Sequence, residues 1–209
     1  MGGGARTDAV IFDLWGTLVD PFPEDARDEI MGPVAAALGA DREQFLRRWS
    51  DLYDERMRGG TIEEHLAAIW PAADPGEAAA LRRVQLRELL RPREDVERTF
   101  AELRRRGLRI GLISICSLDV AEAWAAVGLA FDAEVYSCSE DVAKPDPRVY
   151  LLAAERLGVR PEACLFVDDH DENLVGAERA GMTGVLIGAG DGGWPGRRIA
   201  AVSGVLAHL

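Results

Sequence analysis

Short apolar runs recur along the chain, and helical patterns separate those in its second half. We predict strands at residues 9–12, 110–113, 133–137, 163–167 and 184–187. One predicted helix begins at Asp146 as its N-cap, with Pro147 at the first helical position, apolar residues on one face and Gly158 after them. This pattern is typical of a capped amphipathic helix. Strands that alternate with helices indicate a parallel sheet covered on both faces, so the pattern predicts an α/β fold.

The segment from residue 24 to residue 90 has a different pattern. It contains no convincing strand, and apolar residues such as Leu38, Phe45 and Trp49 recur at helical spacing. We therefore expect a small helical bundle between the first predicted strand and the rest of the sheet.

Composition narrows the class of protein. The 209 residues are 48% hydrophobic, which argues against wholesale disorder, and the formal net charge is -12. An acidic surface repels phosphate backbones and anionic lipid, and no apolar run approaches the roughly 18 residues of a membrane span, so we expect neither nucleic acid nor membrane partners. The cysteines are odd in number and lack metal-ligand spacing, which favours a reducing, cytoplasmic setting: Cys116, Cys138 and Cys164.

Polar residues follow three of the predicted strands. Asp13 comes directly after the first strand, and Gly16 permits a sharp turn just beyond it. Ser114 follows the second strand, and Asp168 with Asp169 follows the fourth. Ligand sites in open α/β sheets gather at the carboxyl ends of strands, so we expect these side chains to share one site with Asp13 as its nucleophile.

Lys144 is the only lysine among the 24 basic residues, in the segment between Ser114 and Asp168. A lysine in a chain that otherwise uses arginine suggests a need for a compact point charge, and the simpler alternative is chance in an arginine-rich composition. One lysine cannot neutralise three converging carboxylates. We therefore expect a hard cation, and carboxylates with room for water suit Mg²⁺.

These residues resemble the four motifs of the haloacid dehalogenase superfamily of hydrolases, in the same order along the chain. The resemblance covers about residues 8 to 190 and implies a Rossmann-like parallel sheet with its first strand in the middle. It also implies a small all-α helical cap, inserted just after the first motif. The corresponding division assigns residues 1–19 and 91–209 to the core and residues 20–90 to the cap.

The resemblance also implies roles for single residues. Asp13 would attack the substrate to form an aspartyl intermediate, while Lys144 and Ser114 would hold the transferred group. Mg²⁺ would be bound by Asp13, Asp168, Asp169 and the backbone carbonyl of Trp15. Substrate contacts would come from Gly16, Thr17, Ser114 and Ile115, and Ile115 stands where the family commonly has an asparagine.

Trp15 departs from the phosphatase pattern. Phosphatases of this family usually carry a second aspartate at this position, which protonates the leaving group, and an indole cannot do so. Three other residues could replace that acid: Asp20, His170 and Asp171. Hydrolytic dehalogenases of the family carry an aromatic residue here, but they work without a metal and normally lack the paired acids seen at Asp168 and Asp169.

Three functions follow from this mixture of motifs. We favour an Mg²⁺-dependent hydrolase of a small phosphorylated metabolite, because uncompensated carboxylates around an anionic nucleophile are costly without a cation. The alternatives are a 2-haloacid dehalogenase-like enzyme, and a binding or regulatory protein in which Trp15 has removed turnover. The substrate itself and the oligomeric state are not readable from the sequence.

Overall fold

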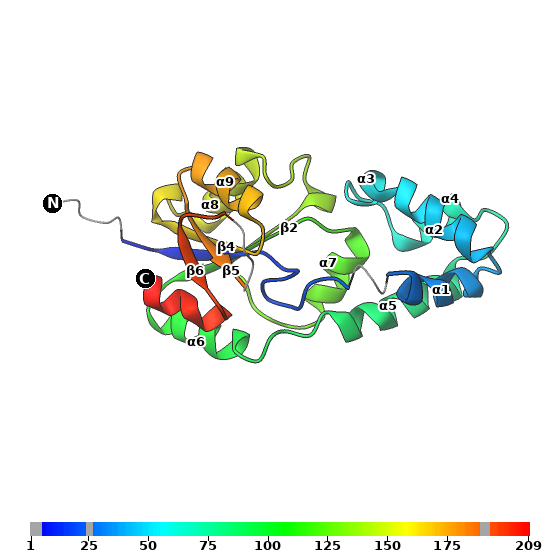
Figure 1. Cartoon of the computed structure of the whole chain (residues 1–209), viewed down its shortest axis with the longest axis horizontal. Coiled ribbons are helices and arrows are strands. Elements are labelled where there is room, and N and C mark those ends of the chain that lie inside the picture. The colour runs from blue at the N-terminus through cyan, green and yellow to red at the C-terminus, as the bar shows by residue number, and fades with distance from the viewer. Residues whose placement is uncertain (1–5, 24–26, 189–192) are drawn as a thin grey trace.

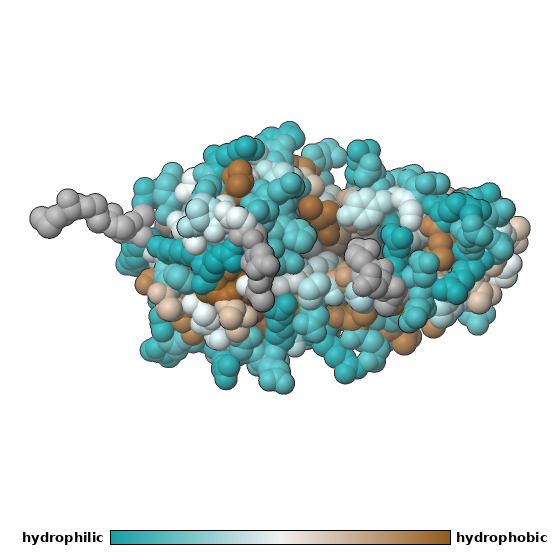
Figure 2. Space-filling model, in the orientation of Figure 1, coloured by the Kyte–Doolittle hydropathy of each residue, from teal (hydrophilic) through white to brown (hydrophobic). Residues whose placement is uncertain are grey.

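The computed structural model describes residues 6–23, 27–188 and 193–209. It is elongated, with a unit built on a β-sheet at one end and a helical unit at the other (Figure 1). No helix among the described residues has both the length and the apolar character that crossing a membrane requires. The face drawn in Figure 2 is mainly hydrophilic, and apolar side chains show between the two units.

The described residues form one six-stranded sheet in the order β3-β2-β1-β4-β5-β6, with every neighbouring pair parallel. Its strands are β1 (Ala9–Phe12), β2 (Arg109–Ser114), β3 (Ala133–Tyr136), β4 (Cys164–Asp168), β5 (Thr183–Ile187) and β6 (Arg197–Ile199). The first strand lies between β2 and β4, as the resemblance implied. The α/β, Rossmann-like fold is confirmed, and the predicted strands agree with the observed ones to within one residue at each end.

Helices cover both faces of this sheet. One face packs against α6 (Val96–Arg105), α7 (Leu118–Ala125) and the 3₁₀ helix η4 (Val202–His208). The other packs against α8 (Pro147–Leu157) and α9 (Asp171–Arg179). Alternate residues of β1 enter the two cores, because successive side chains of a strand point to opposite faces. Two short 3₁₀ helices, η2 (Ser137–Ser139) and η3 (Pro161–Ala163), complete this unit.

The predicted caps of α8 are present. The side chain of Asp146 accepts a hydrogen bond from the backbone N–H of Arg148 at 2.9 Å, and Pro147 is the first helical residue. Gly158 ends the helix with a φ of 63°, a left-handed conformation that glycine adopts without steric cost.

The edge strand β6 was not predicted. It follows residues 188–196, a glycine-rich run whose composition we interpret as a surface loop. Residues 189–192 of that run lie outside the described residues. Trp194 within the run is buried, because it packs against Gly184 in β5 and Gly196 ahead of β6. The surface-loop interpretation is therefore wrong for Trp194.

The helical unit consists of α1 (Arg27–Ala37), α2 (Arg42–Asp51), α3 (Tyr53–Arg56), α4 (Ile62–Ile69) and α5 (Gly76–Leu89). Its apolar side chains form a cluster separate from the two that flank the sheet, with Phe45 and Leu66 fully buried at its centre. The last turn of α5 departs from this arrangement, since Leu86 and Leu90 pack into a core of the sheet. The separate cluster supports the division at residues 20 and 90, which stays our proposal.

The two connections between the units are tied together near the sheet. The backbone N–H of Arg93 donates to the carbonyl of Leu18 at 2.9 Å, and its guanidinium Nη2 donates to the carbonyl of Gly16 at 2.9 Å. The return from the helical unit is thus fastened to the turn that follows β1.

Candidate active site

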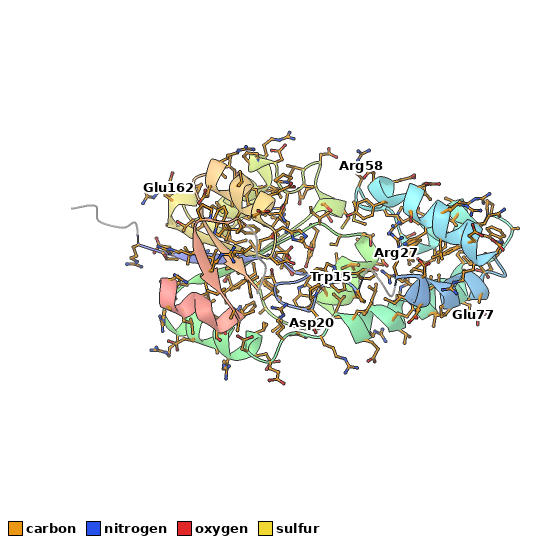
Figure 3. The ribbon with its side chains drawn as sticks, in the orientation of Figure 1. Trp15, Asp20, Arg27, Arg58, Glu77 and Glu162 are labelled. Carbon is orange, nitrogen blue, oxygen red and sulfur yellow. The ribbon has the colours of Figure 1, made fainter. Side chains whose placement is uncertain are left out.

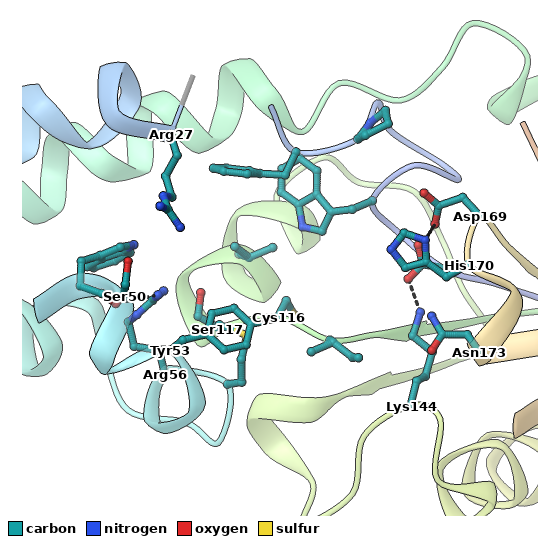
Figure 4. A pocket seen from close by; sticks show the side chains of 18 of the residues that line it. Arg27, Ser50, Tyr53, Arg56, Cys116, Ser117, Lys144, Asp169, His170 and Asn173 are labelled. Atoms are coloured by element: carbon teal, nitrogen blue, oxygen red, sulfur yellow. Dashed lines mark hydrogen bonds and ion pairs between the residues drawn. The ribbon is translucent and has the colours of Figure 1, made fainter. Parts of the chain in front are cut away.

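A cavity of about 520 Å³ lies between the carboxyl edge of the sheet and the helical unit. Asp13 follows β1 and Asp168 ends β4, and the backbone N–H of Asp13 donates to the carbonyl of Val167 at 2.9 Å. Because neighbouring parallel strands end at the same edge, both carboxylates reach the cavity wall. Figure 4 shows this end of the cavity with Lys144, Asp169 and His170.

Lys144 bridges two carboxylates at the floor of the cavity. Its ammonium lies 2.5 Å from Oδ1 of Asp13 and 2.7 Å from Oδ2 of Asp168, and all three residues are buried. Burial lowers the pKa of Lys144, but the charges of Asp13 and Asp168 outweigh it and raise that pKa above its usual range. Lys144 is therefore positively charged and positions the predicted nucleophile.

Both carboxylate oxygens of Asp168 accept hydrogen bonds from other groups of the protein. Besides Lys144, it accepts a hydrogen bond from the backbone N–H of His170 at 2.8 Å. The side-chain amide of Asn173 donates to both of its oxygens, at 3.0 and 3.1 Å. Asn173 lies in α9 just after β4, and these contacts fix the orientation of the Asp168 carboxylate.

Asp169 lies against the turn after β1. A Cβ atom built on Gly16, whose φ is 76°, would fall 2.0 Å from Oδ2 of Asp169, so only a glycine leaves room for this carboxylate. The imidazole Nδ1 of His170 is 3.7 Å from Oδ1 of Asp169. Burial and the charge of Asp168 raise the pKa of Asp169 above its ordinary value.

The carboxylates here suit a divalent cation. Burial raises the pKa of Asp13 above its ordinary value, and Asp168 and Asp169 add to this increase against the opposing charge of Lys144. Oxygen or nitrogen atoms of Asp168, Asp169 and His170 lie within 4.8 Å of one another. Hard oxygen donors with more negative charge than one lysine offsets are the donor set that Mg²⁺ prefers.

Trp15 lines the cavity beside Asp13, and Figure 3 places it between the sheet and the helical unit. Its ring meets that of Phe22 edge-on, with ring centroids 5.6 Å apart, and together they form an aromatic wall. Of the three residues considered as replacement acids, His170 lines the cavity, whereas Asp20 and Asp171 are not among the described residues that do so.

The predicted substrate contacts are only partly brought together. Ile115 lines the cavity, but Gly16, Thr17 and Ser114 are not among the described residues that form its wall. Thr17 and Ser114 are buried, and their hydroxyl groups have no hydrogen-bond partner of good geometry among the described residues. The structure thus places the Ser114 hydroxyl behind the cavity surface, close to the Cys116 thiol.

The opposite end of the cavity carries residues that sequence reasoning missed. Arg27, Arg56 and Arg82 line it, together with Trp49 and Tyr53. Arg56 and Arg82 are buried, which is unusual for arginine. No pattern marks them in the sequence, because helical periodicity does not tell which polar side chain faces a second unit.

A model of the haloacid dehalogenase-like hydrolase family matches residues 7–181. The chain belongs to this family. The geometry described above therefore forms the candidate active site of a haloacid dehalogenase-like hydrolase.

Relatives of this hydrolase include both phosphatases and dehalogenases. It is 37% identical to a glyceraldehyde 3-phosphate phosphatase of Methanopyrus kandleri, over 87% of this chain and 84% of that protein. It is 29% identical to (S)-2-haloacid dehalogenase 4A of Burkholderia cepacia, over 86% of this chain and 82% of that protein. The crystal structure of a HAD phosphatase from Thermococcus onnurineus matches its fold with a TM-score of 0.73 at 23% identity, covering 97% of each chain.

Proposed function

We propose that this hydrolase is an Mg²⁺-dependent phosphatase of a small phosphorylated metabolite, with Asp13 as the nucleophile. The observation that carries the proposal is the grouping of Asp13, Asp168 and Asp169 around a single Lys144. A site for a neutral or monoanionic carbon substrate has no need for this excess of buried carboxylate, which is costly unless a cation offsets it.

The chemistry proceeds in two steps on the Asp13 carboxylate. One of its oxygens attacks phosphorus, the phosphorus–oxygen bond to the leaving group breaks, and an aspartyl phosphate forms. Water then attacks that phosphorus, which releases phosphate and restores the carboxylate. Lys144 holds Asp13 in place and offers its positive charge to the transferred group, while Asp168, itself held by the amide of Asn173, fixes Lys144.

The metal would be held by Asp13, Asp169 and the backbone carbonyl of Trp15. Asp168, which we also expected as a ligand, already has its oxygens bonded to Lys144, Asn173 and His170, so we assign it to positioning Lys144. When bound, Mg²⁺ would neutralise the negative charge shared by the transferred phosphoryl group and the carboxylates.

Trp15 limits the range of good substrates. An indole neither protonates the leaving group nor activates water, so esters with good leaving groups should react fastest. The same aromatic wall of Trp15 and Phe22 favours a second candidate, attack of Asp13 on the carbon of a 2-haloacid. The (S)-2-haloacid dehalogenase relative agrees with this alternative.

We expect the enzyme to work in the cytoplasm. The three cysteines are buried free thiols, which agrees with a reducing compartment. The aspartyl phosphate chemistry calls for a small-molecule partner whose phosphoryl group reaches the floor of the cavity.

The deciding experiment is to trap Asp13 with beryllium fluoride, which mimics an aspartyl phosphate, and to follow the adduct by ¹⁹F NMR. We expect a signal that requires Mg²⁺ and is absent from Asp13→Asn. On an aryl phosphate, Asp13→Asn should lower kcat by at least about 10³-fold. Wild-type protein that forms no Mg²⁺-dependent adduct contradicts the proposal.

Two further outcomes separate the alternatives. Release of chloride from 2-chloropropionate that persists in excess chelator assigns the dehalogenase reaction. An adduct without turnover of aryl, acyl or sugar phosphates above the level of Asp13→Asn assigns a binding or regulatory role.

A further inference from the structure

The two ends of the cavity have opposite charge. The acids that line it among the described residues are Asp13, Asp168 and Asp169, all from the sheet. The helical unit instead contributes an arginine cluster, which we define as Arg27 of α1, Arg56 of α3 and Arg82 of α5. In Figure 4, Arg27 and Arg56 extend into the space opposite Lys144 and Asp169.

Arg82 lines this end of the cavity, and one of its donors has no partner among the described residues. The residue is 5% exposed, and its Nε is 3.3 Å from Oδ2 of Asp119 in α7. Its Nη1 is buried and has no hydrogen-bond partner among the described residues. Buried donors in folded proteins are almost always paired, and a charged one is especially costly to leave unpaired, so this nitrogen requires an acceptor.

Arg56 is likewise a buried arginine with a donor that has no partner among the described residues. It is 6% exposed, its guanidinium stacks over the ring of Trp49 with Cζ 3.8 Å from the centroid, and Nη2 donates to the Trp49 carbonyl at 3.2 Å. Its Nε has no partner among the described residues. Stacking fixes the plane of the guanidinium and leaves its remaining donors available in a set direction.

Of the two buried guanidinium groups, only that of Arg82 has an ion pair with Asp119 among the described residues. Burial and the positive charge of Arg82 lower the pKa of Arg56 to about 10, against the opposing negative charge of Asp119. An ion pair that only joined the two units would need Arg82 and Asp119 alone. Arg56 therefore leaves an excess positive charge at this end of the cavity, in a chain whose overall formal charge is -12.

We propose that the arginine cluster binds a second anionic group of the substrate, a carboxylate or a phosphate, at the end of the cavity away from Asp13. The substrate is then a phosphate ester with two anionic ends, one held at Lys144 and the other at Arg56 and Arg82. This inference rests on the proposed function for the identity of the first group. Planar guanidinium groups with free donors match the paired oxygens of either anion.

The test is calorimetric binding of phosphonates, which contain no cleavable ester, to the wild-type protein with saturating Mg²⁺. The probes are straight alkylphosphonates of two to six carbons that end in a methyl group, a carboxylate or a second phosphonate. We expect one chain length with an anionic end to bind at least about tenfold more tightly than its methyl-ended match. Equal affinity of all three ends at every length overturns the inference.

Two variants test whether the tighter binding of the anionic-ended probes comes from the arginine cluster. Arg56→Gln should bring the ratio of the dissociation constants of the methyl-ended and anionic probes close to one. Arg83→Gln is the matched control: it also removes one guanidinium from the helical unit, but Arg83 pairs with Glu63 and is not among the described residues that line the cavity. A ratio that is unchanged in Arg56→Gln overturns the assignment to this cluster.

The outcomes keep this inference separate from the proposed function. Preferential binding of the anionic-ended probes without any phosphatase turnover refutes the proposed function and leaves the second anion site standing. Phosphatase turnover with equal affinity for all three probe ends refutes the second anion site alone. The comparison within the wild-type protein decides the inference even where a variant fails to fold.

Discussion

Trp15 occupies the place where a phosphatase of this family usually has an acid, and its ring faces the cavity beside Asp13. Trp15→Asp should raise kcat on alkyl phosphates by about 10²–10⁴-fold, because a general acid at this position can protonate a poor leaving group. The gain should be much smaller on 4-nitrophenyl phosphate, whose leaving group needs little protonation. Steady-state kinetics on both esters measure this difference.

Trp15→Asn is the matched control for this prediction. It removes the indole and gives a side chain of the same size as aspartate without an acid, so it should leave the alkyl phosphate rate near that of the wild type. Equal gains in Trp15→Asp and Trp15→Asn would mean that the indole limits access to the site and that acid catalysis is not what the wild type lacks.

The predictable residues of this site are those that directly follow strands. Asp13, Asp168 and Asp169 could be expected to meet because parallel strands end at one edge, and the cavity wall includes all three. Arg56 and Arg82 could not be predicted, because their roles depend on how the helical unit packs against α7. Ser114 shows a further limit: a strand-end position does not tell whether a side chain faces the cavity or lies behind its wall.

Helix α9 approaches the segment that carries Lys144 more closely than any side chain permits. A Cβ atom on Gly176 would lie 2.3 Å from the carbonyl oxygen of Pro145, which is backbone and cannot rotate away. Gly176→Ala should lower the free energy of unfolding by about 1–3 kcal/mol and lower kcat, because relief of the contact moves Lys144 from Asp13. Urea denaturation and kinetics with an aryl phosphate measure the two effects.

Gly193→Ala, in the segment before β6, provides the control, since no atom of the described residues lies within 4 Å of the Cβ atom it would introduce. It should leave both stability and rate near the wild-type values. A Gly176→Ala protein with unaltered kcat would show that the position of Lys144 does not depend on this contact.

The elements that could be predicted are those with a strong local pattern. The buried strands β1, β2, β4 and β5 are runs of apolar residues, and α8 has its N-cap and its C-terminal glycine in the sequence. The edge strand β6 spans three residues, two of them exposed arginines, so it has neither an apolar run nor a clear alternation. It forms by pairing with the open edge of β5. A tertiary contact of this kind leaves no local pattern in the sequence.

At the scale of the whole molecule, a buried ion pair joins the helical unit to the sheet. Arg82 in α5 and Asp119 in α7 are both almost fully buried, and the hydroxyl of Ser117 also donates to Asp119. Asp119→Asn should lower the free energy of unfolding by about 3–5 kcal/mol, because it leaves the buried guanidinium of Arg82 without its carboxylate partner. Urea denaturation followed by tryptophan fluorescence measures this loss.

The corresponding control breaks an ion pair inside the helical unit. Arg83 and Glu63 each have side chains that are 38% exposed, so Glu63→Gln should cost less than about 1 kcal/mol. Similar losses in Asp119→Asn and Glu63→Gln would contradict a special role for the buried pair in joining the units.

The two hydrogen bonds that Arg93 donates to the carbonyls of Leu18 and Gly16 have a mechanical consequence. Asp169, the carboxylate proposed to hold the ion, lies against Gly16. The same short turn therefore contacts both this carboxylate and the connection to the helical unit. Any rotation of the helical unit about its two connecting segments pulls on that turn. Movement of the helical unit and weakening of the proposed metal site are therefore expected to occur together, so that product release and relaxation of the active site form one event.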